Sequence, residues 1–369
     1  MSVRKAIKNV LAHHYASKEQ KHEEALNLKG LPDASFSPLT REEKEIIQNI
    51  WGGVYNVTSF KEFEVFKHYN GFDGRYLSHY LYLPLVARKL NNYRYTKFFE
   101  NKGLLDYLCN SGIRFPKTFI RRIDNEYYDM QMQQITKDEA INILLDKNEL
   151  IVKDSVDSAG GKSVKKLPLK DLSQNERIEI INKEFSSRRA DFVVQECVKQ
   201  SEAMARFNKS SLNTLRISTL YLNGNATVCN IVLRFGKPHM MLDNWGAGGI
   251  LCGVATDGKL RHTGWDIQLN PFNDFNGIPF DGTVISELPE ILPIIINVHK
   301  ESFSLCKFIG WDICIDENGR PCVIEANSSQ PGIFGEQLCN GPIFGERTQE
   351  VIDYINTKPF VYNKAFVRF

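Results

Sequence analysis

The chain has 369 residues, of which 42% are hydrophobic and 24% charged, as expected of a globular protein with two or three lobes. Lysine and arginine number 46 against 44 aspartates and glutamates, and this near balance excludes the basic excess of a protein that coats duplex nucleic acid. The apolar runs are too short to cross a bilayer. The eight cysteines form no C-x-x-C pair and are typical of buried thiols in a reducing compartment, so we expect a cytoplasmic protein.

Residues 1–95 carry helix signals and are expected to form a helical N-terminal lobe. Thr40 and Ser59 each stand three residues before a glutamate, which is the capping-box pattern at a helix start. Within residues 1–21, apolar side chains recur at helical spacing among lysines and arginines. Such a helix can contact an anionic membrane. Because this apolar stripe is short, we expect it to dock on the helical lobe, with at most a weak peripheral membrane contact.

From about residue 113 the sequence changes to short β-branched runs that are separated by turn signals. Helical stretches fall near residues 136–147, 175–186 and 286–308. Strands and helices interleaved in this way indicate an α/β or α+β body. The predicted strands lie at residues 117–120, 149–154, 191–198, 213–222, 226–235, 311–316 and 322–327.

Two of these strands are predicted to form a hairpin that brings two carboxylates together. Asn318-Gly319 is the preferred pair for a two-residue type I′ turn, which would set Glu317 opposite Arg320. Counting outward from that turn places Asp312 directly opposite Glu325, at a Cβ separation of roughly 4.5–5.5 Å. Two carboxylates this close repel each other unless one is protonated or a cation lies between them.

Asn327 lies two residues beyond Glu325 and therefore shares its face of the predicted strand. An aspartate, a glutamate and an asparagine amide supply only oxygen ligands, which suit Mg²⁺ together with nucleotide phosphates. The hairpin therefore predicts a magnesium site at Asp312, Glu325 and Asn327. The alternative is a surface hairpin that happens to carry two unrelated acids.

Residues 150–164 predict a short strand that ends in Lys153 and is followed by a loop of small residues. Backbone N–H groups in such a loop can close over phosphates, and a lysine supplies a positive charge. The Walker A pattern fails here, because Val156 stands where that pattern requires a glycine. A Gly-Gly turn between ordinary strands is the structural alternative.

Together these segments resemble the ATP-grasp superfamily, more specifically its sugar-transfer associated branch, over roughly residues 96–340. The resemblance implies an α+β ATP-grasp fold, in which two α+β lobes clasp ATP. It implies a helical N-terminal lobe at residues 1–95, a first ATP-binding lobe at 96–200, and a C-terminal lobe with the metal site and acceptor loops at 201–369.

The resemblance also implies ATP-binding residues by position. Lys102 and Lys153 match the two lysine segments, although Asn101 stands where many members have aspartate, and Gln195 replaces a frequent glutamate at the adenine hinge. Glu202 matches the residue that holds the ribose hydroxyls. The full implied set is Lys102, Lys153, Ser158, Gly160, Gly161, Gln195, Glu196, Val198 and Glu202.

For catalysis, the resemblance implies ATP with Mg²⁺, in the form of two ions on Asp312, Glu325 and Asn327. Members that ligate amino acids often carry an arginine two residues before the metal aspartate, but this chain has Gly310 there. Arg216 or Arg234 is therefore expected to supply the charge for the transferring phosphoryl group. A two-residue turn between their strands would place these arginines on opposite faces, whereas a three-residue loop would place them together.

The implied activity is that of a carboxylate–amine ligase that works through an acyl phosphate on a sugar or sugar-linked precursor in polysaccharide biosynthesis. A kinase that phosphorylates a hydroxyl acceptor is the alternative, and a nucleotide-binding regulatory subunit is a third. The partner is a small-molecule or sugar-linked acceptor, and the oligomeric state stays open. Candidate acceptor residues are Asn244, Gly248, Gly249, His239 and His262.

Overall fold

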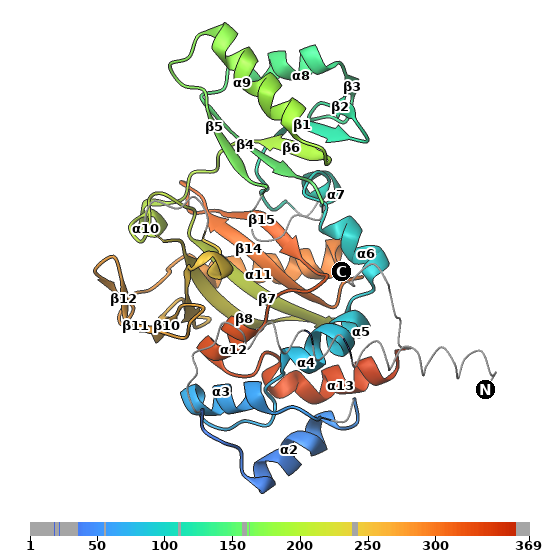
Figure 1. Cartoon of the computed structure of the whole chain (residues 1–369), viewed down its shortest axis with the longest axis vertical. Helices are drawn as coiled ribbons and strands as arrows, with labels where there is room; N and C mark the ends of the chain where they lie inside the picture. Colours follow the sequence, from blue (N-terminus) through green and yellow to red (C-terminus); the bar gives the residue numbers. More distant parts are fainter. Residues whose placement is uncertain are drawn as a thin grey trace, which may run out of the picture.

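The computed structural model describes residues 18, 22, 36–54, 57–109, 112–156, 161, 163–237 and 243–358. The predictions made for the amphipathic N-terminal segment, Ser158, Gly160 and His239 lie outside the described residues. Figure 1 shows a small sheet with two helices at one end, a large sheet in the middle and a group of helices at the other end.

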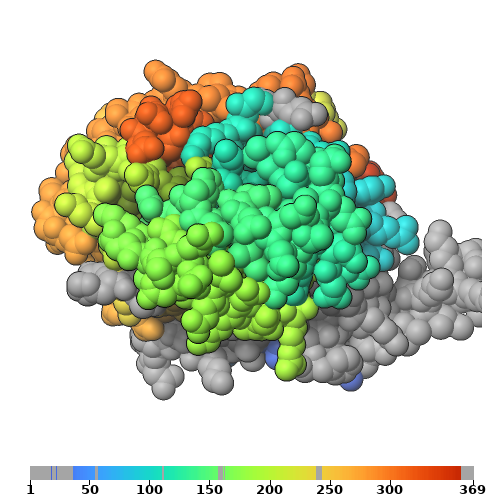
Figure 2. Space-filling model, turned by 90° about the horizontal axis from the view of Figure 1, so that it is seen from above, coloured from blue at the N-terminus to red at the C-terminus, as the bar shows by residue number. Residues whose placement is uncertain are grey.

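The small lobe is built on a six-stranded antiparallel sheet in the order β3-β2-β1-β6-β4-β5. Helices α8 (Lys137–Leu144) and α9 (Gln174–Ser187) pack against it, and capping boxes begin both helices, as the S/T-x-x-E pattern dictates. Figure 2 shows this lobe from above, with the segment around residues 250–320 reaching beyond it. The strands are β1 (Thr118–Ile123), β2 (Glu126–Tyr128), β3 (Gln134–Ile135), β4 (Glu149–Asp154), β5 (Lys165–Pro168) and β6 (Phe192–Gln195).

The large lobe is built on a seven-stranded antiparallel sheet in the order β11-β10-β9-β8-β7-β14-β15. Helix α11 (Leu288–Ser302) packs in the core on one face, together with Phe99, Leu105 and Cys109 from the segment before the small lobe. The strands are β7 (Thr214–Leu222), β8 (Asn225–Phe235), β9 (Ile250–Val254), β10 (Leu260–Trp265), β11 (Pro271–Phe272), β14 (Phe308–Ile315) and β15 (Pro321–Asn327). A separate hairpin joins β12 (Asp274–Phe275) to β13 (Ile278–Pro279), and the short helix α10 (Glu202–Ala205) precedes β7. This mixture of antiparallel sheets and packed helices confirms the α+β class.

The opposite face of the large sheet is covered by the predicted helical lobe together with C-terminal helices. The capping box at Thr40 is present, whereas the one predicted at Ser59 is wrong, because the helix begins at Lys61 without a side-chain cap. The helices on this face are α2 (Arg41–Trp51), α3 (Lys61–Asn70), α4 (His79–Leu81), the π-helical turn η1 (Tyr82–Ala87), α5 (Arg88–Leu90), α12 (Phe334–Asn340) and α13 (Thr348–Asn356). Helices α6 (Tyr93–Phe99) and α7 (Leu105–Leu108) contribute Phe99 and Leu105 to the core on the α11 side. Short 3₁₀ turns lie at η2 (Trp245–Ala247) and η3 (Gly345–Arg347).

All eight cysteines are free thiols, as their spacing indicated, and five of them are buried. Within the described residues, no helix is both long enough and apolar enough to cross a bilayer.

Gln337 joins helix α12 to the helical lobe through its side-chain amide. It is fully buried; its Nε2 donates to the carbonyl of Leu77 at 2.9 Å, and its Oε1 accepts from the N–H of Leu77 at 2.9 Å. The amide thus pairs with both backbone groups of Leu77, as a neighbouring strand would. Buried backbone groups need such partners, because losing one costs about 1–3 kcal/mol.

We expect Gln337→Leu to lower the free energy of unfolding by about 2–4 kcal/mol, because it leaves both backbone groups of Leu77 without the amide. Urea unfolding followed by tryptophan fluorescence measures this, since all four tryptophans lie in the large lobe and the helical lobe. Gln349→Leu, at an exposed position on α13, is the control and should stay within about 0.5 kcal/mol of wild type. Equal midpoints for the two variants would contradict this assignment.

Candidate active site

The β14–β15 hairpin pairs Asp312 with Glu325, as predicted, but through a different turn. The backbone N–H of Asp316 donates across the hairpin to the carbonyl of Arg320, and of the pair Asn318-Gly319 only the glycine has a positive φ, of +74°. The loop therefore has three residues, and the predicted pairing of Glu317 with Arg320 is wrong. Compared with the predicted two-residue turn, a three-residue loop shifts the register between β14 and β15 by one residue. A β-bulge at Ile324, between the paired residues Val323 and Glu325, shifts it back.

The two predicted phosphate lysines converge on this hairpin from the small-lobe side. Lys102 Nζ lies 2.8 Å from Glu325 Oε1, and its backbone N–H donates to the carbonyl of Ser155 at 2.9 Å. Lys153 Nζ donates to the carbonyl of Ile324 at 3.5 Å. Burial, with Lys102 close by, lowers the pKa of Lys153 to about 8. Two buried cations beside an acidic strand are suited to hold phosphates.

The predicted adenine hinge follows strand β6 and is held by side chains on both sides. Gln195 is buried, and its Nε2 donates to Thr118 Oγ1 at 2.9 Å. Glu196 accepts from Arg114 Nη2 at 2.7 Å and from the backbone N–H of Lys117 at 2.8 Å. These contacts orient the backbone of residues 196–198 and engage the Glu196 carboxylate.

Val198 belongs to a small apolar cluster next to the hinge, whereas Glu202 is the exposed first residue of helix α10. The cluster offers an apolar surface between the hinge and the lysine pair, since Ile324 is one of its members. Its residues are Val198, Cys314, Cys322, Leu212 and Ile324.

Arg216 on β7 and Arg234 on β8 lie on the same face of the large sheet. Their strands are joined by a two-residue turn at Asn223 and Gly224, both with positive φ, which by itself would separate the arginines. A bulge at Cys229 shifts the register by one residue and reverses that outcome. A one-residue shift in strand register moves every following side chain to the other face of the sheet. The expectation that a two-residue turn places these arginines on opposite faces is therefore wrong.

Both arginines bind the buried carboxylate of Asp312. Arg216 Nε lies 2.6 Å and Arg234 Nη1 lies 2.9 Å from Asp312 Oδ1. Burial raises the pKa of Asp312, but the two guanidinium groups outweigh it and lower the pKa to about 2. Arg234 also binds Asp243 at 2.9 Å, and Asp243 accepts a hydrogen bond from the backbone of Thr214 at 3.1 Å. These are buried charge networks and not surface ion pairs.

The predicted metal residues form one continuous polar surface. Asn327 Nδ2 lies 3.3 Å from Asp312 Oδ2, and Glu325 lies directly opposite Asp312 and is partly exposed. Within the described part of the chain, no three histidines, cysteines, aspartates or glutamates form a metal-binding group, and the predicted set has two acids and one amide. The carboxylate and amide oxygens of this set are donors of the kind that Mg²⁺ prefers, so the residue types fit the ion. In this structure both Asp312 oxygens accept from Arg216, and Asn327 turns its Nδ2 toward Asp312.

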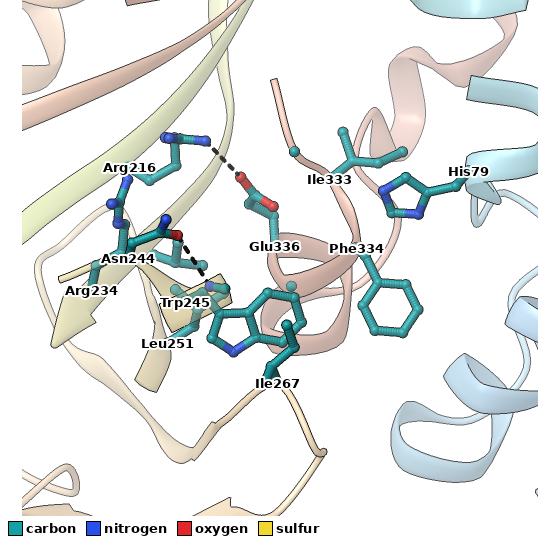
Figure 3. A pocket seen from close by; sticks show the side chains of 14 residues that line it. His79, Arg216, Arg234, Asn244, Trp245, Leu251, Ile267, Ile333, Phe334 and Glu336 are labelled. Atoms are coloured by element: carbon teal, nitrogen blue, oxygen red, sulfur yellow. Dashed lines mark hydrogen bonds and ion pairs between the residues drawn. The ribbon is translucent and has the colours of Figure 1, made fainter. Parts of the chain in front are cut away.

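Beyond the arginines, the structure contains a cavity of about 370 Å³. Figure 3 shows Glu336 between Arg216 and His79, with Trp245, Phe334 and Ile267 on the other side of the space. Glu336 Oε1 lies 3.7 Å from Arg216 Nη1. The lining comprises His79, Arg216, Val232, Arg234, Asn244, Trp245, Gly246, Leu251, Ile267, Gly332, Ile333, Phe334, Gly335 and Glu336.

Of the described acceptor candidates, Asn244 lines this cavity and the others lie elsewhere. Gly249 packs so closely that a Cβ would come within 2.7 Å of the Phe235 carbonyl, and Gly248 has a φ of +93°, so both shape the loop. His262 is exposed on β10, where its Nδ1 lies 2.7 Å from Asp281 Oδ2. Asn244 accepts from the backbone N–H of Gly246 at 3.1 Å and starts the turn that places Trp245 on the cavity.

Three side chains of the site were not predicted from the sequence. Glu336 and His79 reach the cavity from α12 and the helical lobe, and Arg114 joins the adenine hinge to the hairpin loop, with its Nε 3.6 Å from Asp316 Oδ2. Each acts through partners that are distant along the chain. A glutamate soon after the metal strand was the one available hint for Glu336.

No curated protein matches the chain. Among solved structures it is similar to the D-alanine-D-alanine ligase from Coxiella burnetii, at 14% identity and a TM-score of 0.40, over 70% of this chain and 58% of that one. It is also similar to biotin carboxylase from Campylobacter jejuni, at 9% identity and a TM-score of 0.43, over 72% of this chain and 48% of that one. The chain thus spans less than two thirds of either structure.

The sequence matches the family described as sugar-transfer associated ATP-grasp over residues 86–353. This range covers well over half of the chain and includes both lysines, the arginine pair, the β14–β15 hairpin and Glu336. The chain therefore belongs to the sugar-transfer associated ATP-grasp family and has the ATP-grasp fold.

Proposed function

We propose that this protein is an ATP-dependent carboxylate–amine ligase that works through an acyl phosphate on a sugar or sugar-linked precursor in polysaccharide biosynthesis. One observation carries the proposal. The half-buried arginine pair lies between a lysine-lined acidic hairpin on one side and a cavity of about 370 Å³ on the other. A reaction that transfers a phosphoryl group from ATP to a second substrate needs two compartments of this kind.

On the nucleotide side, Lys102 and Lys153 neutralise the phosphates, and the loop with Ser158, Gly160 and Gly161 covers them. The hinge at residues 195–198 offers its backbone to the adenine edge. Glu202, which is exposed at the start of α10, is free to reach the ribose hydroxyls from its position beside the hinge.

Asp312, Glu325 and Asn327 would hold Mg²⁺, in the proposed form of two ions. The bound ions supply charge neutralisation at the phosphate oxygens. We assign to Arg216 and Arg234 the charge that develops on the transferring phosphoryl group and on the oxyanion of the attacked carbonyl. Because both side chains are only 14% exposed and are held by Asp312, they meet that charge with little reorganisation.

The proposal is tested by measuring ADP and phosphate release with candidate acceptors. Phosphate release that requires an amine identifies a ligase. A phosphorylated acceptor formed without phosphate release identifies the alternative, a kinase acting on a hydroxyl. Mass spectrometry of material that copurifies with the protein supplies the first acceptors to try.

Glu325→Gln should reduce ATP turnover about a hundredfold or more while the fold is kept, because it removes one ligand charge and the partner of Lys102. Steady-state ADP release measures turnover, and thermal melting checks the fold. Glu317→Gln, at an exposed position on the tip of the same hairpin, is the control and should turn over normally. Normal turnover in Glu325→Gln at ordinary Mg²⁺ would disprove the metal assignment.

Nucleotide affinity should fall as the pH rises through about 8. Burial lowers the pKa of Lys153 to about 8, so above this pH the free protein increasingly carries a neutral Lys153, while phosphates require the charged form. We expect about a tenfold loss of affinity between pH 7 and pH 9, measured by titration with MgATP. Arginine stays charged throughout this range, so Lys153→Arg should flatten the profile.

Two alanine variants complete that test. Lys153→Ala should weaken nucleotide binding more than Lys162→Ala, because Lys153 lies beside the acidic hairpin. An unchanged pH profile in Lys153→Arg, or equal losses in the two alanine variants, would show that another group binds the phosphates.

A further inference from the structure

Glu336 is a buried carboxylate that faces the cavity and whose ion pair with Arg216 is long. Its side chain is 6% exposed, and Arg216 Nη1 lies 3.7 Å away. The shorter contacts of Arg216, at 2.6 and 3.0 Å, go to the two oxygens of Asp312. Burial is the main cause of a raised pKa at Glu336, and the nearby arginines only partly oppose it. A buried carboxylate whose negative charge is only partly compensated can bind one more cation.

The backbone around Glu336 is held firmly, so its side chain has a fixed position. The carbonyl of Glu336 accepts from Asn230 Nδ2 at 3.2 Å, and the next residue, Gln337, is fully buried and bound to Leu77. A Cβ on Gly335 would come within 2.3 Å of Leu251 Cδ1, so helix α12 packs tightly on strand β9. These contacts aim the carboxylate into the cavity (Figure 3).

The rest of the cavity is largely apolar and aromatic. Trp245 stacks near Phe334, with ring centroids 6.2 Å apart at an angle of 25°, and Trp245 Nε1 is fixed by the carbonyl of Trp265 at 3.1 Å. Leu251, Ile267 and Ile333 complete this wall. Such a cavity suits a compact molecule with one flat apolar face and a single charged group at its arginine end.

Resting on the ligase function proposed above, we propose that this cavity binds an acceptor that carries an amine, and that Glu336 binds its ammonium group and takes one of its protons. The neutral amine then attacks the carbonyl carbon of the acyl phosphate held at Arg216 and Arg234. The new C–N bond forms, the C–O bond to phosphate breaks, and the second nitrogen-bound proton leaves with inorganic phosphate.

An amine fits this site better than a hydroxyl because of charge. An ammonium group compensates the buried carboxylate of Glu336, whereas a neutral hydroxyl leaves that charge with the partial compensation from the arginines, of which Arg216 lies 3.7 Å away. A charge-assisted hydrogen bond is roughly twice as strong as a neutral one. The flat body of the acceptor is either a sugar ring or an aromatic ring, since both pack against the indole of Trp245.

The test uses matched pairs of probes that differ in the amine. D-glucosamine is compared with D-glucose, and benzylamine with benzyl alcohol, by ligand-observed NMR on the full chain without nucleotide. In at least one pair we expect the amine to bind wild type about tenfold or more tightly than its hydroxyl counterpart. The pair that shows this preference distinguishes a sugar from an aromatic acceptor.

Glu336→Gln should abolish the preference for the amine, because it keeps the shape of the side chain and removes its charge. Glu346→Gln is the matched control: Glu346 is 92% exposed and pairs with Arg75 on the surface, so this variant should keep the preference. If Glu336→Gln does not fold, Glu336→Asp replaces it and should reduce the preference while keeping the charge.

Equal binding of amine and hydroxyl, no binding of either amine, or a preference that survives in Glu336→Gln would overturn this assignment. Binding of MgATP is measured in parallel on the same proteins. If wild type does not bind MgATP, the proposed function fails, whereas normal MgATP binding without an amine preference means that the acceptor assignment alone has failed.

Discussion

The architecture of the site depends on the carboxylate of Asp312, which is buried in the large sheet between two guanidinium groups. Removing such a charge from water costs several kcal/mol unless it is paired, and here Arg216 and Arg234 come from two adjacent strands to pair it. The same contacts hold the arginines at the boundary between the hairpin and the cavity. One buried acid thus positions two cations at the boundary between the hairpin and the cavity.

Two β-bulges make that arrangement possible. The bulge at Cys229 brings Arg234 to the face that carries Arg216, and the bulge at Ile324 keeps Glu325 opposite Asp312. A single-residue shift of register moves every side chain to the other face, so without either bulge the charges would separate. Bulges close to a site often aim side chains in this way, and here each one corrects the register that its turn would impose.

Much of the fold follows from local sequence patterns, because strand periodicity, capping boxes and turn residues act over a few positions. Strand β4 occupies the predicted residues, and Lys102, Lys153 and Glu325 meet as the motifs indicated. The opposition of Asp312 and Glu325 was predicted correctly, but from a two-residue turn that the structure does not have. The β-bulge at Ile324 cancels the difference between the predicted turn and the observed loop. No turn motif in the sequence encodes the position of this bulge.

The cavity resists prediction because it is assembled from distant segments. Glu336 comes from a helix that follows the hairpin, and its neighbour Gln337 anchors that helix to Leu77 in the helical lobe. His79 reaches the same cavity from that lobe, with its backbone N–H bound to Glu62 at 2.7 Å. Docking of the helical lobe and placement of Glu336 therefore depend on one another. The apolar stripes of the N-terminal helices indicate only packing. Through His79, however, these helices also form part of the cavity that faces the arginines.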